Sequence, residues 1–286
     1  MRHLEQYRER GFAVVRRVFD GSDVAALSAA FDEVKAAGAV HRKTFRHGNV
    51  LYAVTEDSRF GPILRFVQWA AYFHPIIARY RVDPRLLHLI EPLVGRDLKQ
   101  ITNSMIWKTP GAADGGFAYH QDSRFRRPPS AFRNVETSIV QTAIAVDAHR
   151  PENGALRMCA GSHRRGELRL GVTQSVFDAR CDESELETVG LDPAAVVDIV
   201  LEPGDVVLWH PYMVHGSHPN SSADERRAYL NAYVVAAHCD RGEWAFRDGE
   251  PCELGVPALI QYEELFERPE PHYVEGPPHP FRPEPP

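Results

Sequence analysis

Apolar side chains recur at helical spacing in the first third of the chain. The clearest stripe lies over 22–38, where they follow at intervals of three and four and therefore share one helix face. Ser22 is suited to begin this helix as its N-cap, and Gly38 is suited to end it. Further helices are predicted over 2–10, 60–80 and 84–94, with a short strand over 12–15.

After residue 97 the pattern changes to short runs rich in Val, Ile, Thr and aromatic residues. Turn-forming residues bound these runs, most clearly in Pro151–Gly154 and Glu202–Asp205. No alternation of strands with long helices is seen, which disfavours a parallel doubly wound sheet and favours a sandwich, jelly roll or barrel. Strands are predicted over 98–108, 137–146, 155–159, 196–201, 206–209 and 228–236.

Composition describes an ordinary soluble protein. The chain has 286 residues, of which 43% are hydrophobic and 25% charged, with a formal net charge of −6. Mild acidity argues against a nucleic-acid partner, and no run is long and apolar enough to predict a membrane helix. Four scattered cysteines and the lack of a signal-peptide pattern predict a cytoplasmic location. The sequence carries no signal for an oligomeric state.

Two separated segments contain metal-binding residue types. In His120-Gln-Asp122 the two outer side chains share one face if the segment is extended, so both could reach one point. The predicted strand 206–209 is followed by histidines at 210, 215 and 218. One of these could complete a face of two histidines and one carboxylate, which is typical of non-haem iron(II) oxygenases.

A pair of arginines precedes the predicted strand 228–236. Arg226 and Arg227 point to opposite faces if the strand has begun, so only one can point inward. A buried arginine needs an anion, and a co-substrate carboxylate suits its planar fork. A surface ion pair is the alternative for either residue.

Taken together, these segments resemble the phytanoyl-CoA dioxygenase family over roughly 8–237. The resemblance implies a mainly β fold, with a double-stranded β-helix (jelly roll, cupin-like) core and N-terminal helices packed on its major sheet. It also implies Fe(II), 2-oxoglutarate as co-substrate and O2. The motifs that carry it are His120-x-Asp122, 152–156, 161–164, 202–205, 215–217 and Arg226.

The resemblance suggests one oxygenase domain over 1–268. Its helical part would cover about 1–97, its jelly-roll core about 98–237 and a C-terminal extension 238–268. Eight prolines fall in 269–286, which predicts a separate Pro-rich tail.

Carried over by position, the family's metal ligands would be His120, Asp122 and His215. Arg226, preferred over Arg227, would pair with the distal carboxylate of 2-oxoglutarate, and no side chain beyond the metal centre would act catalytically. Other co-substrate contacts would come from Ser217, Thr102 and Ser104. Substrate-pocket positions are expected at Trp107, Phe117, Tyr119, Arg124 and Phe125.

The activity implied is hydroxylation, or another oxidation, of an unactivated C–H bond in a small metabolite or natural-product intermediate. Succinate and CO2 would be the co-products. Halogenating relatives lack the carboxylate that Asp122 supplies here. The arginines in 124–127 would bind an anionic substrate or form a solvated basic loop.

Two other functions are compatible with the same fold. One is a cupin-type metal oxygenase that does not use 2-oxoglutarate, and the other is a non-catalytic jelly-roll binding protein. Arg226 and Ser217 favour 2-oxoglutarate use over the first alternative, and a complete ligand set argues against the second.

Overall fold

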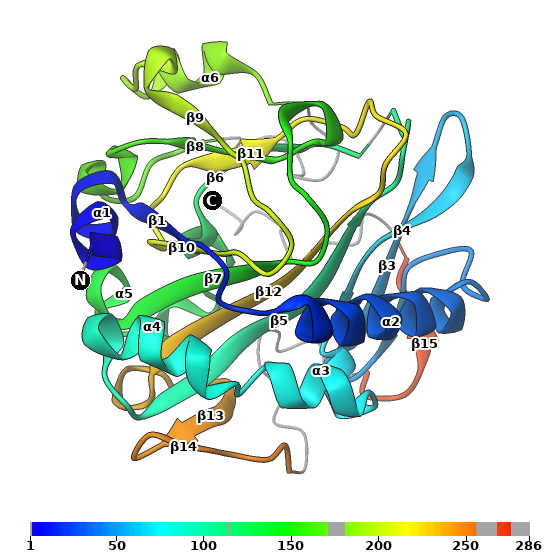
Figure 1. The fold of residues 1–286 in the computed structure, drawn as a ribbon, viewed down its shortest axis with the longest axis horizontal. Coiled ribbons are helices and arrows are strands. Elements are labelled where there is room, and N and C mark those ends of the chain that lie inside the picture. Colours follow the sequence, from blue (N-terminus) through cyan, green and yellow to red (C-terminus); the bar gives the residue numbers. More distant parts are fainter. Residues whose placement is uncertain (1, 114, 171–180, 256–267, 276–286) are drawn as a thin grey trace.

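The structure is a computed structural model that describes residues 2–113, 115–170, 181–255 and 268–275 (Figure 1). Its strands form two antiparallel sheets. The larger has the spatial order β1 (Phe12–Val15), β10 (Val206–Trp209), β7 (Ile139–Ala145), β12 (Arg226–Val235), β5 (Leu98–Lys108), β4 (Gly61–Gln68), β3 (Val50–Asp57), β2 (Phe45–His47) and β15 (His272–Tyr273). In addition, β13 (Glu243–Arg247) pairs with β5, and β14 (Glu250–Pro251) pairs with β13. The smaller sheet has the order β6 (Phe117–His120), β11 (His215–Ser217), β8 (Leu156–Cys159) and β9 (Val196–Ile199).

Helices cover the outer face of the larger sheet, whereas the smaller sheet lies across its other face (Figure 1). The α-helices are α1 (Arg2–Arg10), α2 (Gly21–Gly38), α3 (Pro75–Tyr80), α4 (Pro84–Val94), α5 (Val135–Ser138) and α6 (Glu183–Thr188). Short 3-10 turns are η1 (Ala70–Tyr72), η2 (Asp122–Phe125), η3 (Pro129–Ala131), η4 (Pro151–Asn153), η5 (Ser162–Arg165), η6 (Pro193–Ala195) and η7 (Ala236–His238). Among the described helices none has both the length and the apolar character that a membrane crossing requires.

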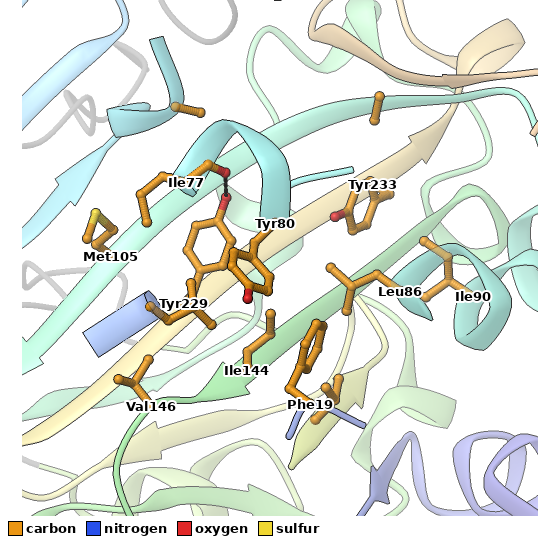
Figure 2. Close-up of a cluster of buried hydrophobic side chains, with 14 of the residues drawn as sticks. Phe19, Ile77, Tyr80, Leu86, Ile90, Met105, Ile144, Val146, Tyr229 and Tyr233 are labelled. Carbon is orange, nitrogen blue, oxygen red and sulfur yellow. Dashed lines mark hydrogen bonds between the residues drawn. The ribbon is translucent and has the colours of Figure 1, made fainter. Parts of the chain in front are cut away.

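The main core lies between the helices and the larger sheet (Figure 2). From β12, Tyr229 and Tyr233 point toward the helical layer, and both rings are fully buried. The Tyr229 hydroxyl donates to the Ile77 carbonyl at 3.0 Å, and the Tyr233 hydroxyl donates to the Arg81 carbonyl at 2.6 Å. Because side chains alternate along a strand, Arg226 and Leu230 of β12 point to the opposite face, where both line the cavity beside the smaller sheet.

The arrangement confirms a mainly β protein with a jelly-roll core and helices packed on the larger sheet. The helix over 84–94 and the strands over 98–108 and 206–209 have the bounds that the sequence pattern predicts. The helix beginning near residue 22 is also present, although Asp20 caps it by accepting from the backbone N–H groups of Ser22 and Asp23.

The prediction of a helix over 60–80 is wrong for the first half of that segment. The segment 1–97 is also not mostly helical, since it contains the strands β1 to β4. Residues 61–68 form β4, which pairs with β3 and β5. Its β-branched and aromatic side chains, such as Ile63, Phe66 and Val67, suit either a strand or a buried helix. Pairing with the preceding strand β3 in a tight hairpin and with the distant strand β5 decides the outcome, and only 75–80 becomes α-helical in this segment.

Candidate metal centre

Three predicted ligands meet where the smaller sheet faces the larger one. His120 ends β6, Asp122 begins η2, and His215 begins β11 directly opposite His120 in the antiparallel ladder. One ligand atom from each lies within 4.8 Å of the others. His215 Nε2 is 3.4 Å from Asp122 Oδ2, and His120 Nε2 is 3.8 Å from Asp122 Oδ1.

Backbone carbonyls orient both imidazole rings. His120 Nδ1 lies 2.8 Å from the Ala118 carbonyl oxygen, and His215 Nδ1 lies 2.9 Å from that of Met213. Since a carbonyl only accepts, each Nδ1 carries the proton and each Nε2 directs a lone pair at the shared point. Burial, followed by the nearby His215, lowers the pKa of His120 to about 3 and keeps it in the neutral form that binds metals.

Two buried donors hold the carboxylate. Trp209 Nε1 donates to Asp122 Oδ2 at 2.8 Å, and the Gln141 amide donates to the same oxygen. Burial would raise the pKa of Asp122, but nearby His215, His120 and then Arg126 outweigh it and hold the pKa below its usual value. The site therefore offers two oriented imidazoles and one oriented carboxylate, a donor set that suits iron(II) and leaves coordination positions open.

The ligands face a cavity of about 130 Å³ between the two sheets. Most of the residues expected to contact co-substrate or substrate line this cavity. They are Thr102, Ser104, Phe117, Phe125, Ser217 and Arg226.

Arg226 is almost completely buried, with 2% of its surface exposed. Its Nη2 donates to the Gly154 carbonyl at 2.5 Å, while its Nε has no hydrogen-bond partner among the described residues. The Ser217 hydroxyl, 1% exposed, also lacks a partner within that part of the chain. Buried donors without acceptors are costly, so the presence of two of them in the lining of one cavity fits a carboxylate ligand such as that of 2-oxoglutarate.

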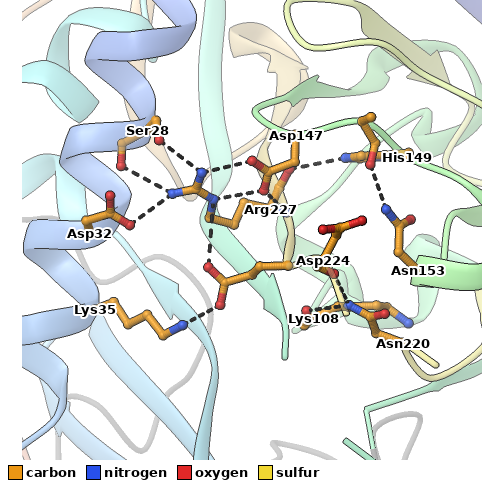
Figure 3. A network of polar contacts seen from close by, with 12 residues as sticks. Ser28, Asp32, Lys35, Lys108, Asp147, His149, Asn153, Asn220, Asp224 and Arg227 are labelled. Atoms are coloured by element: carbon orange, nitrogen blue, oxygen red, sulfur yellow. Dashed lines mark hydrogen bonds and ion pairs between the residues drawn. The ribbon is translucent and has the colours of Figure 1, made fainter. Parts of the chain in front are cut away.

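Arg227 points the other way, into a polar network between β12 and α2 (Figure 3). Its Nε and Nη2 donate to Asp147 at 2.8 Å, and its Nη1 donates to Asp32 at 3.0 Å. Lys35 of α2 reaches the same region by pairing with Glu225. The two adjacent arginines therefore occupy opposite faces of the strand, with Arg226 on the cavity side.

Three expected pocket residues do not line the cavity. Trp107 lies an odd number of positions from Thr102 and Ser104 on β5, so it faces the helical layer and packs 4.9 Å from the Phe31 ring centre. Tyr119 adjoins His120 on β6 and points to the opposite face, into a separate apolar cluster.

Arg124 is the third of these residues, and Nη1 of its guanidinium lies 3.3 Å from the Leu170 carbonyl. The arginine of this loop that does line the cavity is Arg126, which the sequence reasoning left in an undivided basic group.

Trp209 and Gln141 were not predicted as supports for the carboxylate. Gln141 does carry a signal, because it is a fully buried amide within the otherwise mostly apolar strand β7. A buried amide needs partners, and here its partner is a candidate metal ligand.

Comparison with known proteins agrees with this geometry. A family model described as Phytanoyl-CoA dioxygenase (PhyH) matches residues 7–228. Dioxygenase lolE1 of Epichloe uncinata is 30% identical over 162 residues, which is 57% of this chain and only about half (54%) of that protein. Methylphosphonate hydroxylase of Gimesia maris is 24% identical over 245 residues, covering 86% of this chain and 84% of the relative.

Among solved structures, the epimerase SnoN in complex with Fe3+, alpha ketoglutarate and nogalamycin RO superposes with a TM-score of 0.63. The two chains are 20% identical, with 96% of this chain and 95% of that one covered. At this identity the likeness concerns the fold. The match of the family model to most of the sequence shows that the chain belongs to the phytanoyl-CoA dioxygenase family of iron(II)- and 2-oxoglutarate-dependent oxygenases.

Proposed function

We propose that this protein hydroxylates, or otherwise oxidises, an unactivated C–H bond of a small metabolite or natural-product intermediate. His120, Asp122 and His215 would hold iron(II), and Arg226 with Ser217 would hold the distal carboxylate of 2-oxoglutarate. The observation that carries the proposal is the shared cavity, in which a three-ligand set and two unsatisfied buried donors face one space.

The residues of the chain bind and orient rather than react. When bound, iron(II) and 2-oxoglutarate supply the oxidising chemistry with O2, and succinate and CO2 leave as co-products. Trp209 and Gln141 fix the carboxylate of Asp122 by occupying its Oδ2. Phe125, Leu156 and Leu230 give the reaction space an apolar lining. No side chain is required as nucleophile or general base.

A small substrate is supported by the size of the cavity, about 130 Å³. The relatives point the same way, since one of them is a methylphosphonate hydroxylase. Use of 2-oxoglutarate, rather than a substrate that chelates the metal alone, is favoured by the buried Arg226 guanidinium.

The proposal includes a single oxygenase domain and a cytoplasmic location. Strands from before residue 97 and from after residue 237 join the same larger sheet, which supports one folding unit. All four cysteines are free, which suits a reducing compartment.

Anaerobic titration with iron(II) and 2-oxoglutarate tests this function. We expect a weak visible charge-transfer band from the chelate, its loss in His215→Ala, and a large drop in 2-oxoglutarate affinity in Arg226→Ala. If the wild-type protein gives no band and consumes no 2-oxoglutarate with any candidate substrate, the proposal fails.

A further inference from the structure

Residues 152–156, one of the motifs that carry the family resemblance, lie directly beside Arg226. They comprise the end of the turn η4 and the start of β8, with Gly154 between the two elements. The Gly154 carbonyl accepts a hydrogen bond from Arg226 Nη2 at 2.5 Å. Within the described residues this is the only hydrogen bond that the Arg226 side chain makes. One backbone carbonyl of the turn therefore holds the guanidinium group in place.

The backbone and the surroundings at position 154 both require glycine. Gly154 has a φ of +78°, in the left-handed region that other residues rarely adopt. An added Cβ would lie 2.6 Å from the His218 carbonyl oxygen and 2.8 Å from Lys108 Cδ. Lys108 Nζ donates to the same His218 carbonyl, and Lys108 is paired with Arg226 across β5 and β12. The turn, the loop after β11 and the end of β5 thus meet closely at Gly154.

Asn153 stabilises the turn in the conformation that presents this carbonyl. The residue is buried, with 5% of its surface exposed. Its Oδ1 accepts from the Arg150 backbone N–H at 2.8 Å, and its Nδ2 donates to the Ala148 carbonyl at 2.8 Å. Because these two hydrogen bonds tie the turn to the segment that follows β7, their loss would leave the Gly154 carbonyl less firmly placed.

We propose that Asn153 and Gly154 are positioning residues for Arg226. The carbonyl of Gly154 restrains the guanidinium group, while the Arg226 Nε is left without a partner among the described residues of the cavity lining. A guanidinium group that is already held loses less conformational freedom when it binds a carboxylate, so the carboxylate binds more tightly. The inference rests on the proposed function, in which Arg226 binds the distal carboxylate of 2-oxoglutarate, and adds the residues that orient this arginine.

A tight turn between β7 and β8 could need the same two residues for stability alone. The two roles differ in their effect on ligand selectivity. 2-Oxoglutarate and 2-oxopentanoate share the 2-oxo acid group that chelates a metal and have the same chain length, but only 2-oxoglutarate has a second carboxylate. Loss of a positioning role weakens the binding of the distal carboxylate alone, whereas a general loss of order weakens the binding of both acids.

Anaerobic titration of the iron(II)-loaded protein with each acid, followed by the charge-transfer band, tests the inference. We expect the wild-type protein to bind 2-oxoglutarate about 100-fold more tightly than 2-oxopentanoate, as for two charge-assisted hydrogen bonds. Asn153→Ala should lower this preference about tenfold by weakening 2-oxoglutarate binding, and Arg226→Ala should abolish the preference. If Asn153→Ala does not fold, Asn153→Ser replaces it, because serine keeps a polar group but cannot reach both partners; a reduction of about threefold is then expected.

Asp192→Ala is the matched control. Asp192 caps η6, another 3-10 turn that begins with proline, by accepting from the Ala194 backbone N–H at 2.9 Å. This variant loses a turn-stabilising hydrogen bond of the same kind, and it should keep the wild-type preference between the two acids.

An unchanged preference in the folded Asn153 variant would overturn the inference. Equal weakening of both acids would do the same, as would an equal loss of preference in Asp192→Ala, since the turn would then contribute only stability. Failure of the proposed function is distinct, because the wild-type protein would then give no band or would bind the two acids equally.

Discussion

Replacing Trp209 by Phe should weaken metal binding without disturbing the fold. The change removes the indole N–H that donates to Asp122 Oδ2 at 2.8 Å, but it keeps an aromatic ring in a fully buried position. A hydrogen bond to a charged group contributes about 1.5–3 kcal/mol. That free energy corresponds to roughly 10- to 100-fold weaker iron(II) affinity.

Anaerobic competition between the protein and a chromophoric chelator measures this affinity. Trp107→Phe is the matched control, because Trp107 is also buried and its N–H has no hydrogen-bond partner among the described residues. It lies on the opposite face of the larger sheet, so its variant should lose packing but bind iron(II) normally. Equal affinities in Trp209→Phe and the wild-type protein would refute the idea that this donor orients the carboxylate.

Three further predictions concern stability. Arg227→Met removes the ion pair with Asp147 and should lower the free energy of unfolding by about 1–2 kcal/mol, measured by urea denaturation, while 2-oxoglutarate affinity changes by less than about threefold. Gly204→Ala should cost about 3 kcal/mol by the same assay, because φ is +86° and the added Cβ would lie 2.1 Å from the Phe19 carbonyl oxygen; an unchanged urea midpoint would contradict this. Burial lowers the pKa of His210 from 6.5 to about 4. The unfolded chain therefore binds this proton first as the pH falls, and stability should drop by about 3 kcal/mol between pH 6.5 and 4. His210→Asn should flatten that part of the pH profile of the metal-free protein.

Local sequence signals predicted much of the fold because several elements are specified by their own residues. The helix over 84–94 has Asp83 before it and Gly95 after it, and the strand over 206–209 is a short apolar run between polar turns. The segment 61–68 could not be assigned in the same way. Its apolar residues suit two periodicities, and one of its two strand partners, β5, lies far along the chain.

In the site, too, some residues could be predicted from nearby sequence, whereas others depend on contacts between distant segments. His120 and Asp122 are linked by a spacing of two, and their place before a turn is visible in the sequence. The roles of Trp209 and Gln141 depend on which strands lie side by side, which single-strand patterns do not reveal. Trp107 was misplaced for a simpler reason, since the alternation along β5 already sets it apart from Thr102.

The division of the site between two sheets has a mechanical consequence. The histidine ligands come from the smaller sheet, whereas Arg226 comes from β12 of the larger one. A co-substrate molecule that chelates the metal and pairs with Arg226 would link the smaller sheet to the larger one. The strands of the smaller sheet are only three or four residues long, so its backbone amides should exchange hydrogen readily in the empty protein and slow down on loading. Ligand binding would therefore slow amide hydrogen exchange in β6, β8 and β11, including at amides that do not contact the ligand.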